Sequence, residues 1–151
     1  MNALRIALRT PARVSPRAFT TTAARWKDSW SNNKDMNFSE FNKLARAPSD
    51  DVILIDTREP DEAAMSPIPG TVNLPFSKVA SALAESNNPG QFQNDFAFPK
   101  PVFQQKMVFV DRTPKRSEAA AEAAKKAGYK NVRMYGGGVK EYHENADKSK
   151  D

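Results

Sequence analysis

The 151-residue chain is predicted to form an α/β domain whose central sheet is mostly parallel, has about five strands and is flanked by helices. Two short runs, Val52–Ile55 and Met107–Val110, are wholly apolar, which is typical of strands buried on both faces of a parallel sheet. Segments with helical spacing or high helix propensity alternate with the strands. A chain of this length suggests one globular domain. No apolar run approaches the roughly 18 residues of a membrane span.

The N-terminal segment differs from the rest in charge. Residues 1–26 carry the whole net charge of +5, since they contain five Arg and no acid, while the remainder holds equal numbers of basic and acidic residues. This Arg-rich, Ser/Thr-containing, acid-free composition is typical of a mitochondrial transit peptide. We expect cleavage between Thr20 and Lys27, followed by a polar lead-in over residues 27–35; a disordered basic tail is the alternative. The neutral remainder gives no support for a nucleic-acid-binding face.

The first half of the domain is expected to alternate strands and helices. A short edge strand is predicted at 36–38, and a helix at 39–46 with Ser39 as its N-cap. The strand Val52–Ile55 runs into a polar turn and a short helix, and Thr71–Leu74 is the next strand.

The second half begins with a predicted helix at 77–84 and a polar connection over residues 85–101. Three aromatics are spaced through this connection, and we interpret them as clamps that hold it to the body rather than as a ligand site. They are Phe92, Phe96 and Phe98. The strand Met107–Val110 and an Ala-rich helix from Ser117 follow.

A basic loop joins that strand to that helix. A strand, a tight loop and a helix N-terminus aim backbone N–H groups at an anion. The candidate anion-binding residues are Arg112, Thr113, Pro114, Lys115, Arg116 and Ser117. The anomaly is Asp111, a carboxylate at the start of what otherwise looks like an anion cradle.

Four segments resemble rhodanese domains. Asp56–Glu62 and Ile68–Pro75 are similar to the Asp-x-Arg-Glu-Pro and Ile-Pro-Gly-Ala-x-Asn-Ile-Pro segments of that family. Asp111–Ser117 is similar to its Cys-Arg-x-Gly-x-Arg-Ser loop, and Gly128–Gly138 to its final turn, strand and Gly-Gly helix start. The resemblance implies a single-domain, thiosulfate sulfurtransferase-like fold over residues 36–145, which leaves 146–151 as a charged tail.

The chain also departs from the family pattern. Ser66 and Pro67 replace the usual Gly and His, and Tyr142 replaces the usual Trp. Asp111 stands at the position of the family's Cys nucleophile, which takes a sulfur atom from its donor and holds it as a persulfide. The chain has no Cys at all, and a carboxylate is a poor sulfur nucleophile. We therefore expect no persulfide-forming activity.

Two roles remain open for Asp111. Its carboxylate could fill the anion cradle and pair with Arg116 or with loop amides, which would close the site to substrate anions. It could instead be an aspartyl nucleophile, as in phosphatases of the haloacid dehalogenase class. Those enzymes have Asp-x-Asp-x-Thr and use magnesium, whereas Arg112 here stands beside Asp111 and the second acid is missing. We favour the paired carboxylate.

The remaining candidates have simpler interpretations. Asp56 and Arg58 are expected to hold the strand-end loops together. His143, the single His, is expected to be solvated, and the glycines 136–138 to supply a permissive strand-to-helix turn rather than a phosphate loop. Glu59, Asp61 and Glu62 are interpreted as a solvated helix start rather than a metal site. We expect neither a cofactor nor a metal.

These observations predict a mitochondrial rhodanese-like protein, on the matrix side, that has lost catalysis and serves as a binding or accessory module. Its partner would be a protein or a larger mitochondrial assembly, with a small anion as a further ligand. The alternative is a residual enzyme, either a weak sulfurtransferase or an anion-processing hydrolase, that uses the loop from Asp111 to Arg116.

Overall fold

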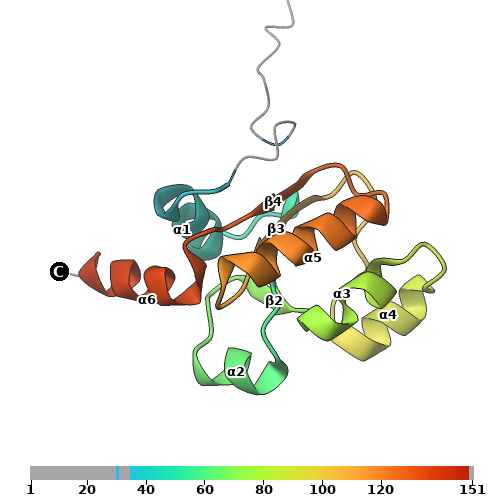
Figure 1. Ribbon diagram of the computed structural model, residues 1–151, viewed down its shortest axis with the longest axis horizontal. Helices are drawn as coiled ribbons and strands as arrows, with labels where there is room; N and C mark the ends of the chain where they lie inside the picture. The colour runs from blue at the N-terminus through green and yellow to red at the C-terminus, as the bar shows by residue number, and fades with distance from the viewer. Residues whose placement is uncertain (1–29, 31–34, 150–151) are drawn as a thin grey trace, which may run out of the picture.

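The computed structural model describes Trp30 and residues 35–149 (Figure 1). The predicted transit peptide and most of the lead-in lie outside the described residues. The elements in chain order are α1 (Phe38–Arg46), β1 (Val52–Asp56), α2 (Pro60–Met65), β2 (Thr71–Asn73), α3 (Phe76–Leu83), α4 (Pro89–Phe96), β3 (Lys106–Val110), α5 (Pro114–Lys126), β4 (Val132–Met134) and α6 (Gly138–Lys148).

The four strands form one parallel sheet in the order β2-β1-β3-β4, which confirms the predicted α/β class. The two central strands, β1 and β3, are the two apolar runs of the sequence. Their register places Asp56 beside Val110. Thr57 and Asp111 are the next residues along the chain, so both lie at the carboxyl edge of the sheet, where ligands bind in parallel α/β folds.

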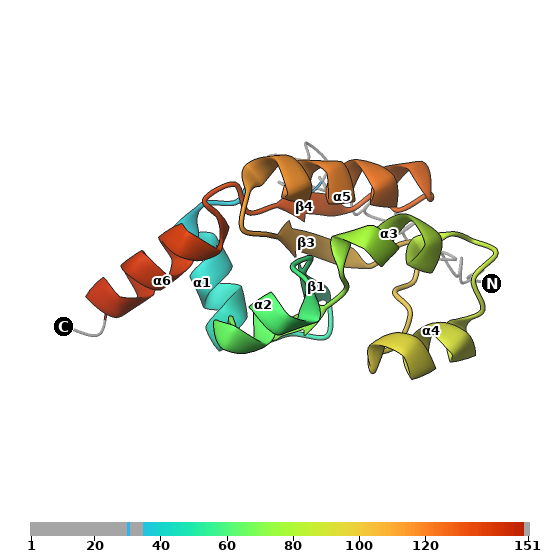
Figure 2. The same ribbon diagram turned by 60° about the horizontal axis from the view of Figure 1, so that its bottom comes forward.

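Side chains of the central strands alternate between two hydrophobic cores. Met107 and Phe109 pack with residues of α3, α4 and α5, whereas Val108 and Val110 pack with residues of α1 and α6. All four side chains are fully buried. Figures 1 and 2 show the corresponding layers, with α3 and α5 on one side of the sheet and α1 and α6 on the other. The sheet edge that carries Asp111 is therefore fixed from both faces.

The predicted edge strand at 36–38 is reduced to a single parallel bridge between Met36 and Tyr135. The Asn37 side chain accepts a hydrogen bond from the Glu40 N–H (2.9 Å), which starts α1 at Phe38. Asn37, rather than Ser39, is thus the N-cap, and the described sheet has four strands instead of about five.

Two segments predicted to be irregular are helical. The connection over residues 85–101 contains α4, which Asn88 caps by accepting from the Gly90 N–H (2.8 Å) and which has Pro89 in its first turn. Phe92 is fully buried and contacts Phe96 with a tilted ring and Phe98 edge to face, so the aromatics do clamp this segment to the core. The charged C-terminal stretch continues α6 to Lys148. Among the described helices, none is long and apolar enough to cross a membrane.

Candidate functional site

The Asp111 carboxylate is completely buried at the carboxyl end of β3. The Thr57 hydroxyl donates to its Oδ2 atom (2.7 Å), and the Arg112 backbone N–H donates to its Oδ1 atom (2.5 Å). The Nε atom of Arg116 lies 3.4 Å from Oδ2. One hydroxyl, one loop amide and one guanidinium therefore surround the carboxylate, in agreement with the paired arrangement favoured from the sequence.

The basic side chains of the loop differ in how closely they approach this carboxylate. The Arg116 side chain is 34% exposed and its guanidinium also lies over the Phe76 ring, 5.7 Å from the centroid. Arg112 extends into solvent with its side chain 73% exposed, and its nearest acid is Glu62 at 3.7 Å. Lys115 is exposed. Only Arg116 is thus committed to Asp111, and the other two cations remain on the surface.

The loop is shorter than the sequence suggested, because α5 begins at Pro114 instead of at Ser117. A proline favours the first turn of a helix, since its φ angle is already helical and its missing N–H has no partner to lose there. The N–H groups of Arg116 and Ser117 both point to the Thr113 carbonyl, at 3.2 and 3.4 Å. These amides are therefore engaged by the helix and do not form an open cradle for an anion.

Asp56 and Arg58 form a second buried pair at the same sheet edge, and here the geometry is tighter. The Arg58 Nη2 and Nε atoms lie 2.6 and 3.1 Å from Asp56 Oδ2, and both side chains are almost fully buried. Arg58 Nη2 also donates to the Ser66 carbonyl (2.8 Å). The side chain of Asn73 donates to the carbonyls of both Asp56 and Arg58. This pair ties β1, β2 and the end of α2 together, which is a structural role.

The start of α6 closes the site from the other side. The Val139 N–H donates to the Asp111 carbonyl (3.1 Å). Gly138 has a φ of 71° and lies so close that a Cβ atom there would be 3.1 Å from the carbonyl oxygens of Asp111 and Arg112. Burial raises the pKa of Tyr135, which keeps its hydroxyl protonated so that it donates to Glu141 in α6 (3.0 Å). Gly138 thus supplies the permissive backbone expected at this strand-to-helix turn.

His143 was expected to be solvated, and this prediction is wrong. Its Nε2 atom lies 2.7 Å from the Ser66 hydroxyl, and the side chain is half-buried. Both residues line a pocket of about 520 Å³ beside Arg112. No local pattern points to this contact, because the two residues are 77 positions apart in the chain.

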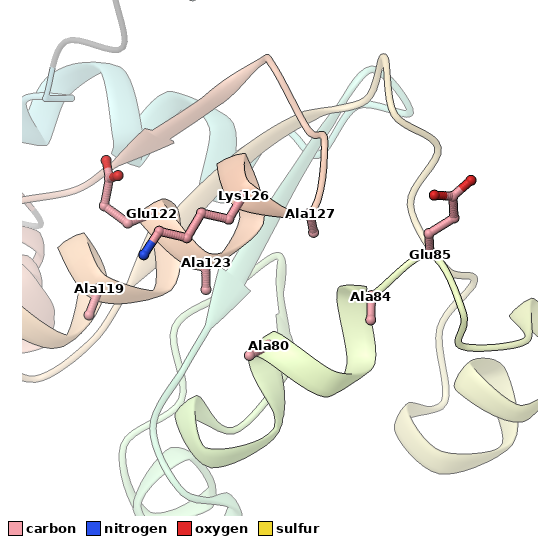
Figure 3. Close-up of a pocket in the computed structure, with 8 residues that line it drawn as sticks. All are labelled: Ala80, Ala84, Glu85, Ala119, Glu122, Ala123, Lys126 and Ala127. Atoms are coloured by element: carbon pink, nitrogen blue, oxygen red, sulfur yellow. The ribbon is translucent and has the colours of Figure 1, made fainter.

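A second, larger groove of about 670 Å³ lies between α3 and α5 (Figure 3). Five alanines line it, together with Glu85, Glu122 and Lys126. Glu122 is paired with Lys125 at 3.1 Å. The methyl groups offer no nucleophile or base, so this groove is a less suitable place for chemistry than the edge that carries Asp111. Within the described residues, no cluster of three or more metal-ligating side chains occurs.

Comparison with known proteins agrees with the fold and with the sequence motifs. The profile of the Rhodanese-like domain family matches residues 37–145. The mitochondrial thiosulfate sulfurtransferase RDL2 of Saccharomyces cerevisiae is 30% identical over 91% of this chain and 84% of its own length. The human thiosulfate:glutathione sulfurtransferase is 36% identical over 60% of this chain and 78% of its own length.

Solved structures give the same result. The crystal structure of the yeast single-domain sulfurtransferase RDL2 matches with a TM-score of 0.69 and 29% identity, covering 74% of this chain and 89% of that chain. The human single-domain sulfurtransferase matches with a TM-score of 0.66 and 32% identity, covering 73% of this chain and 95% of that chain. The matched family segment contains both buried pairs, the loop after β3 and the Gly-rich start of α6. The chain therefore belongs to the rhodanese-like domain family.

Proposed function

We propose that this protein is a mitochondrial rhodanese-fold module that has lost persulfide transfer and acts as a binding or accessory component. The observation that carries the proposal is the state of Asp111: it occupies the nucleophile position of the family pattern, is fully buried, and is paired with Thr57, Arg112 and Arg116. Because the chain contains no Cys, no other thiolate exists in it to accept sulfur.

The loop backbone supports the same conclusion. In the family pattern a Gly stands where this chain has Pro114, and proline has no N–H to offer an anion. The amides of Arg116 and Ser117 turn inward to the Thr113 carbonyl. A thiosulfate or phosphate ion would thus meet a buried carboxylate and few free amides, which makes anion capture at this loop unfavourable.

The alternative function is a residual enzyme that uses Asp111 as a nucleophile or base. An attacking carboxylate oxygen must reach its substrate, whereas Asp111 has no exposed surface and both of its oxygens accept hydrogen bonds. The geometry therefore favours the binding module over the enzyme.

A sulfur-transfer assay on the purified chain tests the proposal. With thiosulfate as donor and cyanide or a small thiol as acceptor, we expect no turnover above the uncatalysed rate. In a matched nuclear magnetic resonance titration, thiosulfate, sulfate and phosphate should leave the amide signals of Arg112 to Ser117 unchanged. Robust turnover, or saturable shifts confined to this loop, would overturn it.

Two variants distinguish the effect of the missing nucleophile on sulfur transfer from the effect of the missing loop amide. Asp111→Cys removes the carboxylate that disfavours anion capture and replaces it with a shorter side chain, which leaves room for a donor sulfur. The new thiol lies beside Thr57 and Arg116, where a thiolate is stabilised, and we expect measurable persulfide formation from thiosulfate. Asp111→Cys with Pro114→Gly should react faster, because the glycine restores a loop N–H. Pro114→Gly alone, the control, should stay inactive.

The leader and the relatives support the proposed mitochondrial location. RDL2, a matched relative, is named as mitochondrial, and residues 1–26 have the composition of a matrix-targeting peptide. We expect the processed chain on the matrix side, and we expect native size separation of mitochondrial extracts to place it in a complex. A free monomer in the matrix would contradict the accessory role while leaving the loss of sulfur transfer intact.

A further inference from the structure

A second cluster of reactive side chains lies next to the closed loop. The pocket of about 520 Å³ is lined by residues of α2 and α6 and by the exposed Arg112 of the loop. Its apolar contribution comes from Met65, which is 86% exposed, and from Val139. Ser66 and His143 face each other within it. Apolar walls with a few convergent polar groups are typical of small-molecule sites.

The contact between Ser66 and His143 has the geometry of a nucleophile and its base. The Ser66 hydroxyl oxygen lies 2.7 Å from the His143 Nε2 atom, within the range in which an imidazole accepts a hydroxyl proton. Ser66 is the residue that ends α2, and His143 projects from α6, so two separate elements hold the pair. The cations of Arg112 and Lys140 line the same pocket. Each has a loose, exposed ion pair with a pocket acid, Glu62 at 3.7 Å and Glu144 at 3.8 Å, so a developing negative charge would compete with these acids for the cations.

We propose that Ser66 and His143 form a second reactive centre, with Ser66 as the nucleophile and His143 as its general base, which acts on small carboxylic esters with a short apolar acyl group. In this centre Asp111 takes no part. The proposal is independent of the loss of sulfur transfer, because it uses neither the buried carboxylate nor a thiol.

Acyl transfer needs only Ser66, His143, the ester and water, because His143 takes up and returns each proton. The Ser66 oxygen bonds to the ester carbonyl carbon while its proton moves to His143 Nε2. The carbon–oxygen bond to the alcohol then breaks, and the alcohol leaves with the proton from the imidazolium. Water next attacks the acyl-serine, His143 takes a proton from that water and returns it to the Ser66 oxygen, and the carboxylic acid is released.

A purely structural contact is the competing interpretation. The His143 Nε2 atom is also 3.4 Å from the Ser66 carbonyl, which already accepts from Arg58. If Nε2 carries the proton, His143 simply fastens α6 to the end of α2 and the Ser66 hydroxyl is not activated. Stability measurements cannot separate the two interpretations, whereas the reactivity of the hydroxyl can.

A fluorophosphonate probe on the full chain is the test. Its phosphorus accepts the Ser66 oxygen, fluoride leaves with the electron pair of the broken bond, and the proton goes to His143. We expect one adduct by intact mass, mapped to Ser66, and slow hydrolysis of p-nitrophenyl acetate. His143→Gln should lower the labelling rate about 100-fold, the lower end of the range for a general base, and Ser66→Ala should abolish it.

The matched control is Ser81→Ala, since the exposed Ser81 hydroxyl donates to a backbone oxygen, the Lys78 carbonyl (3.1 Å), and not to an imidazole. This variant should label at the wild-type rate. The proposal is overturned if the wild-type chain is not labelled, or if Ser66 is labelled no more strongly than Ser81. This result needs no variant, so it holds even if His143→Gln fails to fold. Unchanged labelling in a folded His143→Gln protein also overturns it.

Discussion

The ends of β1 and β3 carry the same pair of residue types in two different arrangements. At the end of β1, Arg58 donates hydrogen bonds to the Asp56 carboxylate from two nitrogen atoms, and both side chains are almost fully buried. After β3, Asp111 is equally buried, but Arg116 reaches it with one nitrogen at 3.4 Å and is one-third exposed. The first carboxylate depends on its arginine for compensation, whereas the second depends mainly on the Thr57 hydroxyl and on the Arg112 amide.

We interpret this difference as one between a pair that holds the scaffold and a pair at the site where the proposed function has lost catalysis. The first pair also engages the Ser66 carbonyl, so its arginine connects segments that must stay in place. The second pair lies in a loop whose family pattern has a Cys, and its arginine stays at the surface beside Phe76. A buried charge that has several neutral donors can be kept without a rigid ion pair.

Arg58→Met should be the most damaging single change at this edge. It leaves the Asp56 carboxylate buried without its cation, which typically costs about 3–5 kcal/mol of the free energy of unfolding. Urea denaturation followed by circular dichroism measures the change. If this variant loses less than about 1 kcal/mol of the free energy of unfolding, the pair is dispensable and Asp56 does not depend on Arg58 for charge compensation.

The double variant Asp56→Asn with Arg58→Met is the matched control for that result. It removes both charges together, so part of the lost stability should return relative to Arg58→Met alone. A double variant that is as unstable as the sum of the two single variants would mean that packing, and not the uncompensated charge, causes the loss.

Asp111→Asn should come second, with a loss of about 2 kcal/mol, since the amide places a donor against the Thr57 hydroxyl or the Arg112 N–H and gives up the charge-assisted bonds. The measurement is the same denaturation series. Residues kept for catalysis often reduce stability, so a neutral or stabilising effect would favour an enzymatic role for Asp111 and weaken the binding-module proposal.

The parts that could be predicted from the sequence are those with local or periodic signals. The apolar runs at Val52–Ile55 and Met107–Val110 identified the two central strands and hence the edge that carries Asp111. The start of α5 at Pro114 was missed, although a proline in a first turn is a known signal. The contact of His143 with Ser66 could not be found, because it depends on how α6 packs against α2 and no local pattern encodes that.

Thr57→Val should cost about 1.5 kcal/mol, because it removes the hydroxyl that donates to the buried Asp111 carboxylate, and hydrogen bonds to charged groups are stronger than neutral ones. Combined with Asp111→Asn, the two losses should fall short of additivity, since both changes break the same bond. Strict additivity in this cycle would show that the hydroxyl contributes through its second acceptor, the Val110 carbonyl, instead.

Arg116→Gln should have the smallest effect, about 0.5 kcal/mol, because a pair with one partner at the surface is screened by solvent and Asp111 keeps its two other donors. The same denaturation series gives the value, and the matched comparison is Arg58→Met. If Asp111 relied on Arg116 as Asp56 relies on Arg58, the two arginine variants would be equally unstable. The ratio of the two losses in free energy of unfolding therefore decides between two roles for the loop after β3. Similar losses would mean that Asp111 and Arg116 are a second structural ion pair. A loss several-fold smaller for Arg116→Gln would mean a former catalytic site whose buried carboxylate is satisfied by the loop backbone and Thr57.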